Sequence, residues 1–181
     1  MKAIIVQGSA RSNGNTNTVV KYFQRKFNSD FIDLKDKNIA HYNYDHHYEN
    51  DNFIEIIETI LKYDLIIFAT PVYWYSMSGI MKTFFDRITD CLKTHKELGR
   101  ALKGKFMAAI SCGYKPMDTE SFFIPFKNCA QYLGMVYLGD VHTWVESEKP
   151  TKEVIMKISD FATTLKNTKK VLTDKDVLCS V

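Results

Sequence analysis

A short polar segment near the N-terminus carries the residues best suited to chemistry. The segment Gly8–Thr16 reads Gly-Ser-Ala-Arg-Ser-Asn-Gly-Asn-Thr and follows an apolar run, Ala3–Val6. Backbone N–H groups at the start of a helix lack partners within the helix, so they can donate to a phosphate. Arg11 adds a permanent charge whose forked donors match phosphate oxygens. The segment therefore predicts a phosphate site, in which the short side-chain donors are Ser9, Ser12, Asn15 and Thr16.

Two familiar phosphate-binding loops do not match this segment. In the loop of nucleotide triphosphatases a glycine is followed by lysine, whereas here Gly14 is followed by Asn15. The dinucleotide fingerprint also fails, because Ala10 and Asn13 occupy the places of its later glycines. Hydroxyls, amides and one arginine favour a terminal phosphomonoester that needs no metal. An ordinary strand-to-helix turn with good capping residues is the alternative that stays open.

Length and composition limit the class of protein. With 181 residues, 45% hydrophobic and 13% aromatic, the chain is expected to form one folded domain over residues 1–170, followed by a polar tail, 171–181. A net charge of +3 with mixed signs argues neither for nucleic acid nor for an anionic membrane as partner, and neither is expected. No apolar run suits a signal peptide or a membrane span. We expect a cytoplasmic protein whose four scattered cysteines are free thiols: Cys91, Cys112, Cys129 and Cys179.

Apolar runs alternate with helical periodicities along the chain. The expected strands are residues 2–7, 31–34, 64–69, 106–110 and 135–142. The first two helices are expected at 15–27 and 51–62. The third begins at Ser76 or Ser78 and reaches a helix end at Leu98-Gly99. The fourth is started or interrupted at Pro125 and ends at Gly134, and the fifth begins near Pro150. This alternation predicts an α/β fold, with a five-stranded parallel sheet in the order 2-1-3-4-5 and helices on both faces.

Three unusual loops would meet at one edge of that sheet. They follow the first, third and fourth strands and span Gly8–Thr16, Thr70–Gly79 and Ser111–Met117. The carboxyl ends of parallel strands share an edge, and the ligand crevice of this topology lies between the first and third strands. The second loop supplies a proline turn and aromatic side chains, and the third supplies small residues. A phosphate site at one end of an aromatic slot predicts a site for flavin mononucleotide (FMN).

Two segments give the chain a family resemblance. Residues 8–16, quoted above, and residues 69–87, Ala-Thr-Pro-Val-Tyr-Trp-Tyr-Ser-Met-Ser-Gly-Ile-Met-Lys-Thr-Phe-Phe-Asp-Arg, resemble the flavodoxin-like NAD(P)H-dependent FMN reductases. The iron–sulfur flavoprotein branch shares these motifs. The resemblance extends over nearly the full chain in element order. It implies a flavodoxin-like three-layer sandwich and FMN as cofactor.

The same resemblance implies an activity and a set of site residues. NADH or NADPH would reduce the flavin, which would then reduce a small-molecule acceptor such as a quinone, flavin, azo or nitro compound. The chemistry would occur at flavin N5 without a catalytic side chain. Such proteins are usually homodimers or homotetramers. The resemblance places Ser9, Arg11, Ser12, Asn15 and Thr16 at the phosphate, Pro71, Val72, Tyr73 and Trp74 beside the isoalloxazine, and Ser111 and Gly113 near the ring from the third loop.

A histidine-rich loop departs from the iron–sulfur branch. Residues 41–48 read His-Tyr-Asn-Tyr-Asp-His-His-Tyr, where those relatives carry cluster cysteines. Because a cluster needs thiolates, an iron–sulfur centre is excluded there. The three histidines with Asp45 could ligate zinc. A solvated or subunit-contact loop is favoured, and no metal is expected.

Other conspicuous residues have simpler interpretations. Lys82 and Asp86 are four residues apart on a helix, which favours a structural ion pair over catalysis. Cys112 is interpreted as a small buried hydrophobe. Tyr73 and Trp74 could instead be core aromatics, although their place after a strand end favours the site. The competing functions are a flavodoxin-type electron carrier without nicotinamide activity, which a mixed surface charge disfavours, and a regulatory flavin-binding protein.

Overall fold

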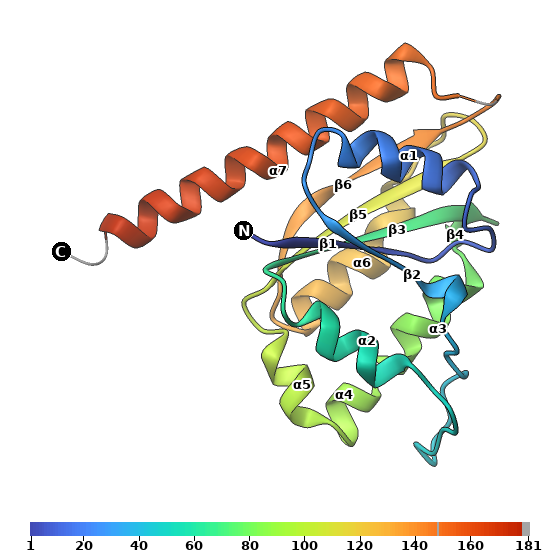
Figure 1. Ribbon diagram of the computed structural model, residues 1–181, viewed down its shortest axis with the longest axis vertical. Helices are drawn as coiled ribbons and strands as arrows, with labels where there is room; N and C mark the ends of the chain where they lie inside the picture. The colour runs from blue at the N-terminus through green and yellow to red at the C-terminus, as the bar shows by residue number, and fades with distance from the viewer. Residues whose placement is uncertain (148, 179–181) are drawn as a thin grey trace.

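The computed structural model describes residues 1–147 and 149–178, in which a central sheet is covered by helices on both faces (Figure 1). Its strands are β1 (Ala3–Gln7), β2 (Asp30–Asp33), β3 (Leu65–Tyr73), β4 (Ser76–Met77), β5 (Phe106–Gly113) and β6 (Val136–Trp144). The helices are α1 (Asn15–Gln24), α2 (Phe53–Ile60), α3 (Gly79–Arg87), α4 (Asp90–Lys93), α5 (Lys96–Ala101), α6 (Glu120–Tyr132) and α7 (Lys152–Leu178), with a 3₁₀ turn, η1 (Leu34–Asp36). None of the described helices is both long and apolar enough to cross a bilayer.

The order of the parallel strands confirms the predicted topology. They run β2-β1-β3-β5-β6, and the short β4 pairs only with β3, in the antiparallel direction. Without β4 this is the order 2-1-3-4-5. From β1 the chain first adds β2 on one side and then β3, β5 and β6 on the other, so the direction of winding reverses between β1 and β3. A ligand crevice is expected beyond the carboxyl ends of these two strands.

Alternating residues of the buried strands contribute to two hydrophobic cores, one on each face of the sheet. Ile4 and Val6 of β1 pack with the layer that contains α2, α3 and α6, whereas Ala3 and Ile5 pack with α1 and α7. Both faces of the sheet are therefore apolar, which explains why its strands read as continuous hydrophobic runs. The two helical layers leave the carboxyl edge of the sheet to the loops.

The third strand is longer than the sequence indicated. Residues Thr70–Tyr73 were expected in a loop, but they continue β3 and turn back through β4 as a hairpin. The position of Pro71 in the strand explains why it is tolerated. Ala69, two residues earlier, directs its backbone groups toward β1, because its carbonyl accepts the N–H of Gly8. Pro71 faces the same side, where β1 has already ended at Gln7, so its missing N–H breaks no ladder bond. The fourth predicted strand also extends, from residue 110 to Gly113.

Several helix boundaries also differ from expectation. Ser78 caps α3, but three short helices, α3 to α5, replace the single predicted one. Gly99 lies inside α5 and does not end it; glycine fits this position because a Cβ there would overlap the carbonyl oxygen of Cys91. Pro125 lies inside α6, which starts at Glu120. The last helix reaches Leu178, beyond Lys169, where the sequence suggested that helical structure ends. The division into a domain of residues 1–170 and a tail stays a prediction.

Candidate functional site

The carboxyl edge of the sheet holds a cleft with three walls. The first wall is the phosphate loop (Gly8–Thr16), the second is the end of β3, and the third is the end of β5 with the residue that follows. This is the crevice that the topology predicts. The cleft is lined by Ser9, Arg11, Gly14, Asn15, Thr16, Pro71, Val72, Tyr73, Cys112, Gly113 and Tyr114.

Most of the predicted site residues line this cleft. Three do not: Ser12, Trp74 and Ser111. Three lining residues had not been assigned to the site, namely Gly14, Cys112 and Tyr114. Each is the sequence neighbour of a predicted residue, so the three predicted loops line the cleft, although not every lining position was predicted. The roles of all these residues toward a cofactor stay predictions.

The phosphate end of the cleft is the start of α1. Gly14 is the N-cap residue, and among the described residues no side chain caps the first turn with a hydrogen bond. The first turn also contains no acidic residue. The free N–H groups and the positive end of the helix dipole therefore remain available to an anion. This is the arrangement that the sequence predicted for a phosphomonoester.

Arg11 extends from the same loop as an exposed cation. Among the described residues its guanidinium has no carboxylate partner. A Cβ added at Gly14 would lie 3.5 Å from Nε of Arg11, an ordinary contact distance, so the guanidinium lies beside the N-cap residue of α1. The cation and the uncapped helix start thus act on the same space.

Of two polar side chains of the loop, one is bonded to the protein itself and the other is buried. Asn15 donates from Nδ2 to the carbonyl oxygen of Val145, at 3.0 Å. Thr16 is 2% exposed. These residues can still offer backbone N–H groups to an anion, whereas the side-chain donor of Asn15 helps to fix the loop to the segment after β6.

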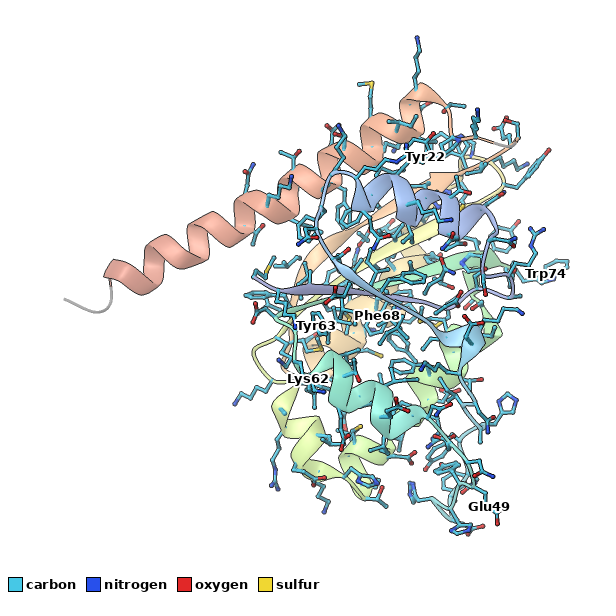
Figure 2. All side chains as sticks on the ribbon, viewed as in Figure 1. Tyr22, Glu49, Lys62, Tyr63, Phe68 and Trp74 are labelled. Atoms are coloured by element: carbon cyan, nitrogen blue, oxygen red, sulfur yellow. The ribbon has the colours of Figure 1, made fainter. Side chains whose placement is uncertain are left out.

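The second wall ends in a strained aromatic turn. Tyr73 pairs with Ser76, so Trp74 and Tyr75 form a two-residue hairpin turn with φ angles of 49° and 62°. Both angles suit glycine or asparagine and cost a bulky residue energy. Trp74 is 94% exposed and projects away from the body of the protein (Figure 2). Tyr73, at 45% exposed, is the aromatic side chain that reaches the cleft from this wall.

The third wall is buried at Ser111 and Cys112 and exposed at Tyr114. A Cβ on Gly113 would lie 3.0 Å from Cε1 of His142, so a side chain at this position would crowd that ring. Ser111 is fully buried, and its Oγ lies 2.8 Å from Nδ1 of His142. Ser111 therefore supports the wall from behind. Burial raises the pKa of Cys112 to about 11, although hydrogen bonds with Thr143 and Thr16 oppose the rise, so this residue remains a neutral thiol.

His142 is a contributor that the sequence did not reveal. Its ring stacks on Trp144, and its Nε2 lies 3.4 Å from the carbonyl oxygen of Lys115. Burial lowers the pKa of His142, and the charge of Lys157 acts in the same direction, whereas the contact with the Lys115 carbonyl opposes it. A neutral ring that accepts from Ser111 and donates to Lys115 satisfies both contacts. His142 thus holds the segment that carries Tyr114.

The cleft fits an FMN molecule in its chemistry. The uncapped helix start and Arg11 match a phosphate dianion. Pro71, Val72 and the flat Gly113 offer apolar and backbone surface that a planar ring system can approach.

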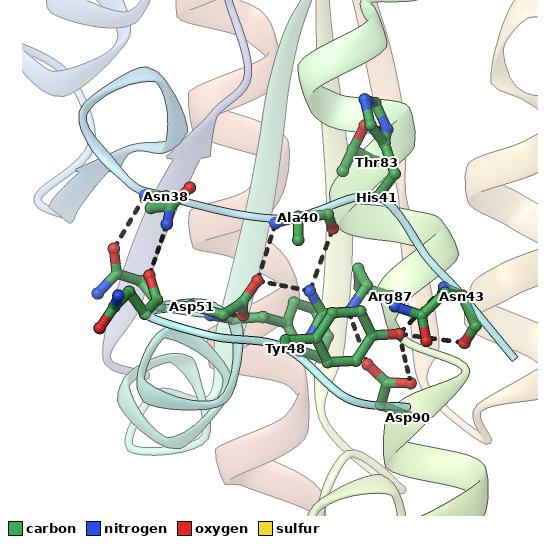
Figure 3. Close-up of polar contacts among 12 residues, drawn as sticks. Asn38, Ala40, His41, Asn43, Tyr48, Asp51, Thr83, Arg87 and Asp90 are labelled. Carbon is green, nitrogen blue, oxygen red and sulfur yellow. Dashed lines mark hydrogen bonds and ion pairs between the residues drawn. The ribbon is translucent and has the colours of Figure 1, made fainter. Parts of the chain in front are cut away.

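The histidine-rich loop is fastened by a second polar cluster, drawn in Figure 3. Arg87 is 1% exposed and donates to Asp51 and Asp90, each at 2.6 Å. Nδ1 of His46 lies 2.6 Å from Asp90, and the ring of Tyr48 covers the guanidinium at 3.3 Å. These contacts explain the loop as a structural element. No group of three or more potential metal ligands occurs in the described part of the chain, and the expectation of no metal stays a prediction.

The remaining conspicuous residues behave as the sequence suggested. Lys82 and Asp86 form an exposed ion pair with a separation of 2.5 Å. Cys112 is buried. Both predictions are confirmed, although Cys112 also lines the cleft.

Sequence comparison identifies relatives of this chain. A family model described as NADPH-dependent FMN reductase matches residues 1–149. The Bacillus subtilis protein YwqN, whose name describes an NAD(P)H-dependent FMN-containing oxidoreductase, is 26% identical over 151 residues, which are 78% of this chain and 83% of YwqN. An NADPH azoreductase of Bacillus sp. strain OY1-2 is 28% identical over 53% of this chain and 54% of its own length.

Solved structures share the fold. The Trp repressor binding protein of Bacillus subtilis superimposes with a TM-score of 0.69 at 24% identity, over 88% of this chain and 98% of that one. An FMN-dependent NADH-azoreductase of Bacillus anthracis, solved with FMN, gives a TM-score of 0.65 at 16% identity, over 91% and 99% of the two chains. At such identities the likeness establishes a flavodoxin-like architecture.

Proposed function

We propose that this chain, which belongs to the family of NADPH-dependent FMN reductases, reduces a small planar acceptor, such as a quinone, a free flavin, an azo or a nitro compound. Family membership makes the chain an oxidoreductase with FMN as cofactor and a nicotinamide dinucleotide as co-substrate. The proposal adds the acceptor class and the roles of the cleft residues. It leaves NADH and NADPH as equal candidates for the reductant.

One observation carries the assignment of the cofactor cleft. An uncapped helix start and a cation without a carboxylate partner among the described residues lie at one end of a cleft, and its other end is apolar and flat. Arg11 and the first N–H groups of α1 would hold the phosphate. Pro71, Val72 and Gly113 would lie against the ring. The side chains of Ser9, Ser12 and Thr16 are proposed as additional phosphate donors, and Ser111 as the buried support of Gly113.

The lining residues suit a reaction without a protein acid or base. When bound, FMN supplies hydride and electron transfer. The titratable side chains of the cleft are Arg11, Tyr73, Cys112 and Tyr114. Burial keeps Cys112 in the thiol form, so it does not compete as a nucleophile. The protein's part is to orient the ring and to leave one of its faces open to substrates.

Exposed aromatic side chains at the mouth of the cleft support a planar acceptor. Tyr114 is 72% exposed and lines the same cleft as Tyr73, from a different loop. Rings at the mouth can stack on a quinone, azo or nitro compound at little cost in side-chain entropy. Trp74 is proposed to act at the same mouth, as a movable wall. The azoreductase among the relatives agrees with this class of acceptor.

Two further properties belong to the proposal. The chain is proposed to work in the cytoplasm, since its scattered cysteines are free thiols where the structure describes them. It is also proposed to form a homodimer or homotetramer, as the family resemblance implies.

Anaerobic reduction tests the proposed function. The purified protein should be yellow with noncovalent FMN, and NADH or NADPH should bleach its visible absorbance in the absence of oxygen. Steady-state kinetics with a quinone or an azo dye should be ping-pong, because nicotinamide and acceptor use the same open face. A flavin that dithionite reduces and both nicotinamides leave oxidised would contradict the proposal and favour an electron carrier.

A further inference from the structure

A buried chain of hydrogen bonds joins the first two walls of the cleft. Gly8 is the first residue of the phosphate loop, and its carbonyl oxygen accepts a hydrogen bond from the hydroxyl of Ser78 at 2.6 Å. The backbone N–H of Ser78 donates to Oγ1 of Thr70 at 3.1 Å. Thr70 in turn donates to the carbonyl oxygen of Pro71, at 3.2 Å, and Pro71 lines the cleft. The chain thus runs from one wall to the other through two side chains.

Neither side chain touches the cleft. Thr70 is fully buried and Ser78 is 1% exposed. The Ser78 hydroxyl also accepts the N–H of Met81 at 3.1 Å, which makes it the N-cap of α3. A helix cap needs only the acceptor function of a hydroxyl. The donation to Gly8 is an additional bond, which crosses 70 residues of sequence.

The phosphate loop also approaches α3 very closely at this point. A Cβ on Gly8 would lie 2.9 Å from Cβ of Met81, closer than such atoms approach in proteins. Gly8 is therefore held between the start of α3 and the end of β3, to which its own N–H donates at Ala69. Because packing blocks movement on one side, the Ser78 bond adds a further restraint on the loop relative to the hairpin.

We propose that Ser78 is a positioning residue that presets the separation between the phosphate end and the ring end of the cleft. The inference rests on the proposed function, since it concerns FMN binding in this cleft. One ligand must satisfy both ends at once, and a preset separation avoids the cost of ordering the two walls during binding. Loss of the bond should therefore weaken a ligand that spans both ends and spare ligands that occupy only one.

Binding of three ligands to Ser78→Ala tests this role. FMN occupies both ends of the cleft, riboflavin occupies the ring end, and inorganic phosphate occupies the phosphate end. The loss of one buried hydrogen bond corresponds to about three- to tenfold in affinity. We expect FMN binding to weaken by about that factor, whereas the affinities for riboflavin and inorganic phosphate stay within about twofold of the unmodified chain.

Two further variants separate positioning from helix capping and misfolding. Thr151→Ala removes the hydroxyl that accepts the N–H of Val154 at the start of α7, and Thr151 is not among the residues that line the cleft. It should lower the melting temperature, as Ser78→Ala does, and leave FMN affinity unchanged. Thr70→Val keeps the shape of the side chain and removes the acceptor of Ser78 N–H. It should reproduce the FMN-specific loss even if Ser78→Ala does not fold.

Several outcomes would overturn the proposal. They are unchanged FMN affinity in folded Ser78→Ala or Thr70→Val, equal losses for FMN and riboflavin, and a matching loss for inorganic phosphate. The last two would mean that the bond builds one end of the cleft and does not set its separation from the other. Failure of the unmodified chain to bind FMN would instead refute the proposed function, so the two failures are distinguishable.

Discussion

Two arginines of this protein have opposite surroundings. Arg11 is exposed on the phosphate loop, and its guanidinium has no carboxylate partner in the part of the chain that the structure describes. Arg87 is buried between Asp51 and Asp90, with the ring of Tyr48 over its guanidinium. Both occur in the segments that carry the family resemblance. A motif alone therefore does not distinguish a ligand-binding arginine from a structural one.

The difference is one of electrostatic satisfaction. Burial would lower the pKa of Arg87, but hydrogen bonds and charges from Asp51 and Asp90 outweigh it and raise the pKa. Burial would likewise raise the pKa of Asp51, and the bonds from Arg87, Ala40 N–H and Phe53 N–H lower it below the usual range. The cluster thus supplies its own counter-charges. The phosphate loop, residues 8–16, contains no carboxylate, so the cation of Arg11 is available to an anionic ligand.

Removal of Arg87, the structural arginine of the two, should lower the stability of the fold. Arg87→Met leaves two buried carboxylates without their cation, and we expect a loss of about 3–5 kcal/mol in the free energy of unfolding. Urea denaturation measures it. The matched control is Lys82→Met on the same helix, where the ion pair with Asp86 is exposed and worth at most about 1 kcal/mol.

A loss for Arg87→Met no larger than that of the control would show that the buried cluster does not hold its loop. Acid titration gives a second measure. Because the pKa of Asp51 is lowered in the folded state, its contribution is present above the ordinary carboxyl range and disappears as pH falls through the lower folded pKa. Arg87→Met should lack this part of the acid sensitivity.

Each buried strand and helix has a local signature in the sequence, an apolar run or a helical spacing of apolar residues. The alternation of these elements indicated the order of the strands. The sequence missed the β3–β4 hairpin because Thr70-Pro71 resembles a turn, and only the early end of β1 shows that a proline fits there. It missed His142 because the partner, Ser111, lies 31 residues away. Contacts across such separations have no local signature.

The functional side of the comparison depends on Arg11. If its guanidinium meets the phosphate, Arg11→Ala should cost about 1.5–3 kcal/mol in FMN binding, the value of a hydrogen bond to a charged group. Riboflavin, which lacks the phosphate, should bind as before. Because Arg11 is exposed, the free energy of unfolding should change by less than about 0.5 kcal/mol. Fluorescence titration with both flavins measures the effect.

Thr16→Val gives the matched comparison on the same loop. Thr16 is buried and its hydroxyl is in contact with Cys112, so a smaller loss of FMN affinity is expected than for Arg11→Ala. Equal losses of FMN and riboflavin affinity in Arg11→Ala would remove this arginine from the phosphate end.

The smallest effect concerns a histidine that supports the cleft without a counter-charge. His142 faces Ser111, the carbonyl oxygen of Lys115, Trp144 and the cation of Lys157, and burial is the largest cause of its lowered pKa. The unfolded chain therefore takes up a proton at a higher pH than the folded chain does. Its contribution to stability is complete above the ordinary histidine pKa of ~6.5, and it is lost as pH falls from there to the lower folded pKa.

His142→Gln keeps a polar side chain that does not titrate, so its free energy of unfolding should decline less than that of the unmodified chain over this interval. Denaturant titrations at a series of pH values give the difference, and parallel declines would assign the pH dependence to other groups. The prediction extends the comparison of the two arginines: Asp90 offers His46 a carboxylate at 2.6 Å, whereas the cleft wall offers His142 neutral partners and a lysine, so protonation of His142 should cost stability.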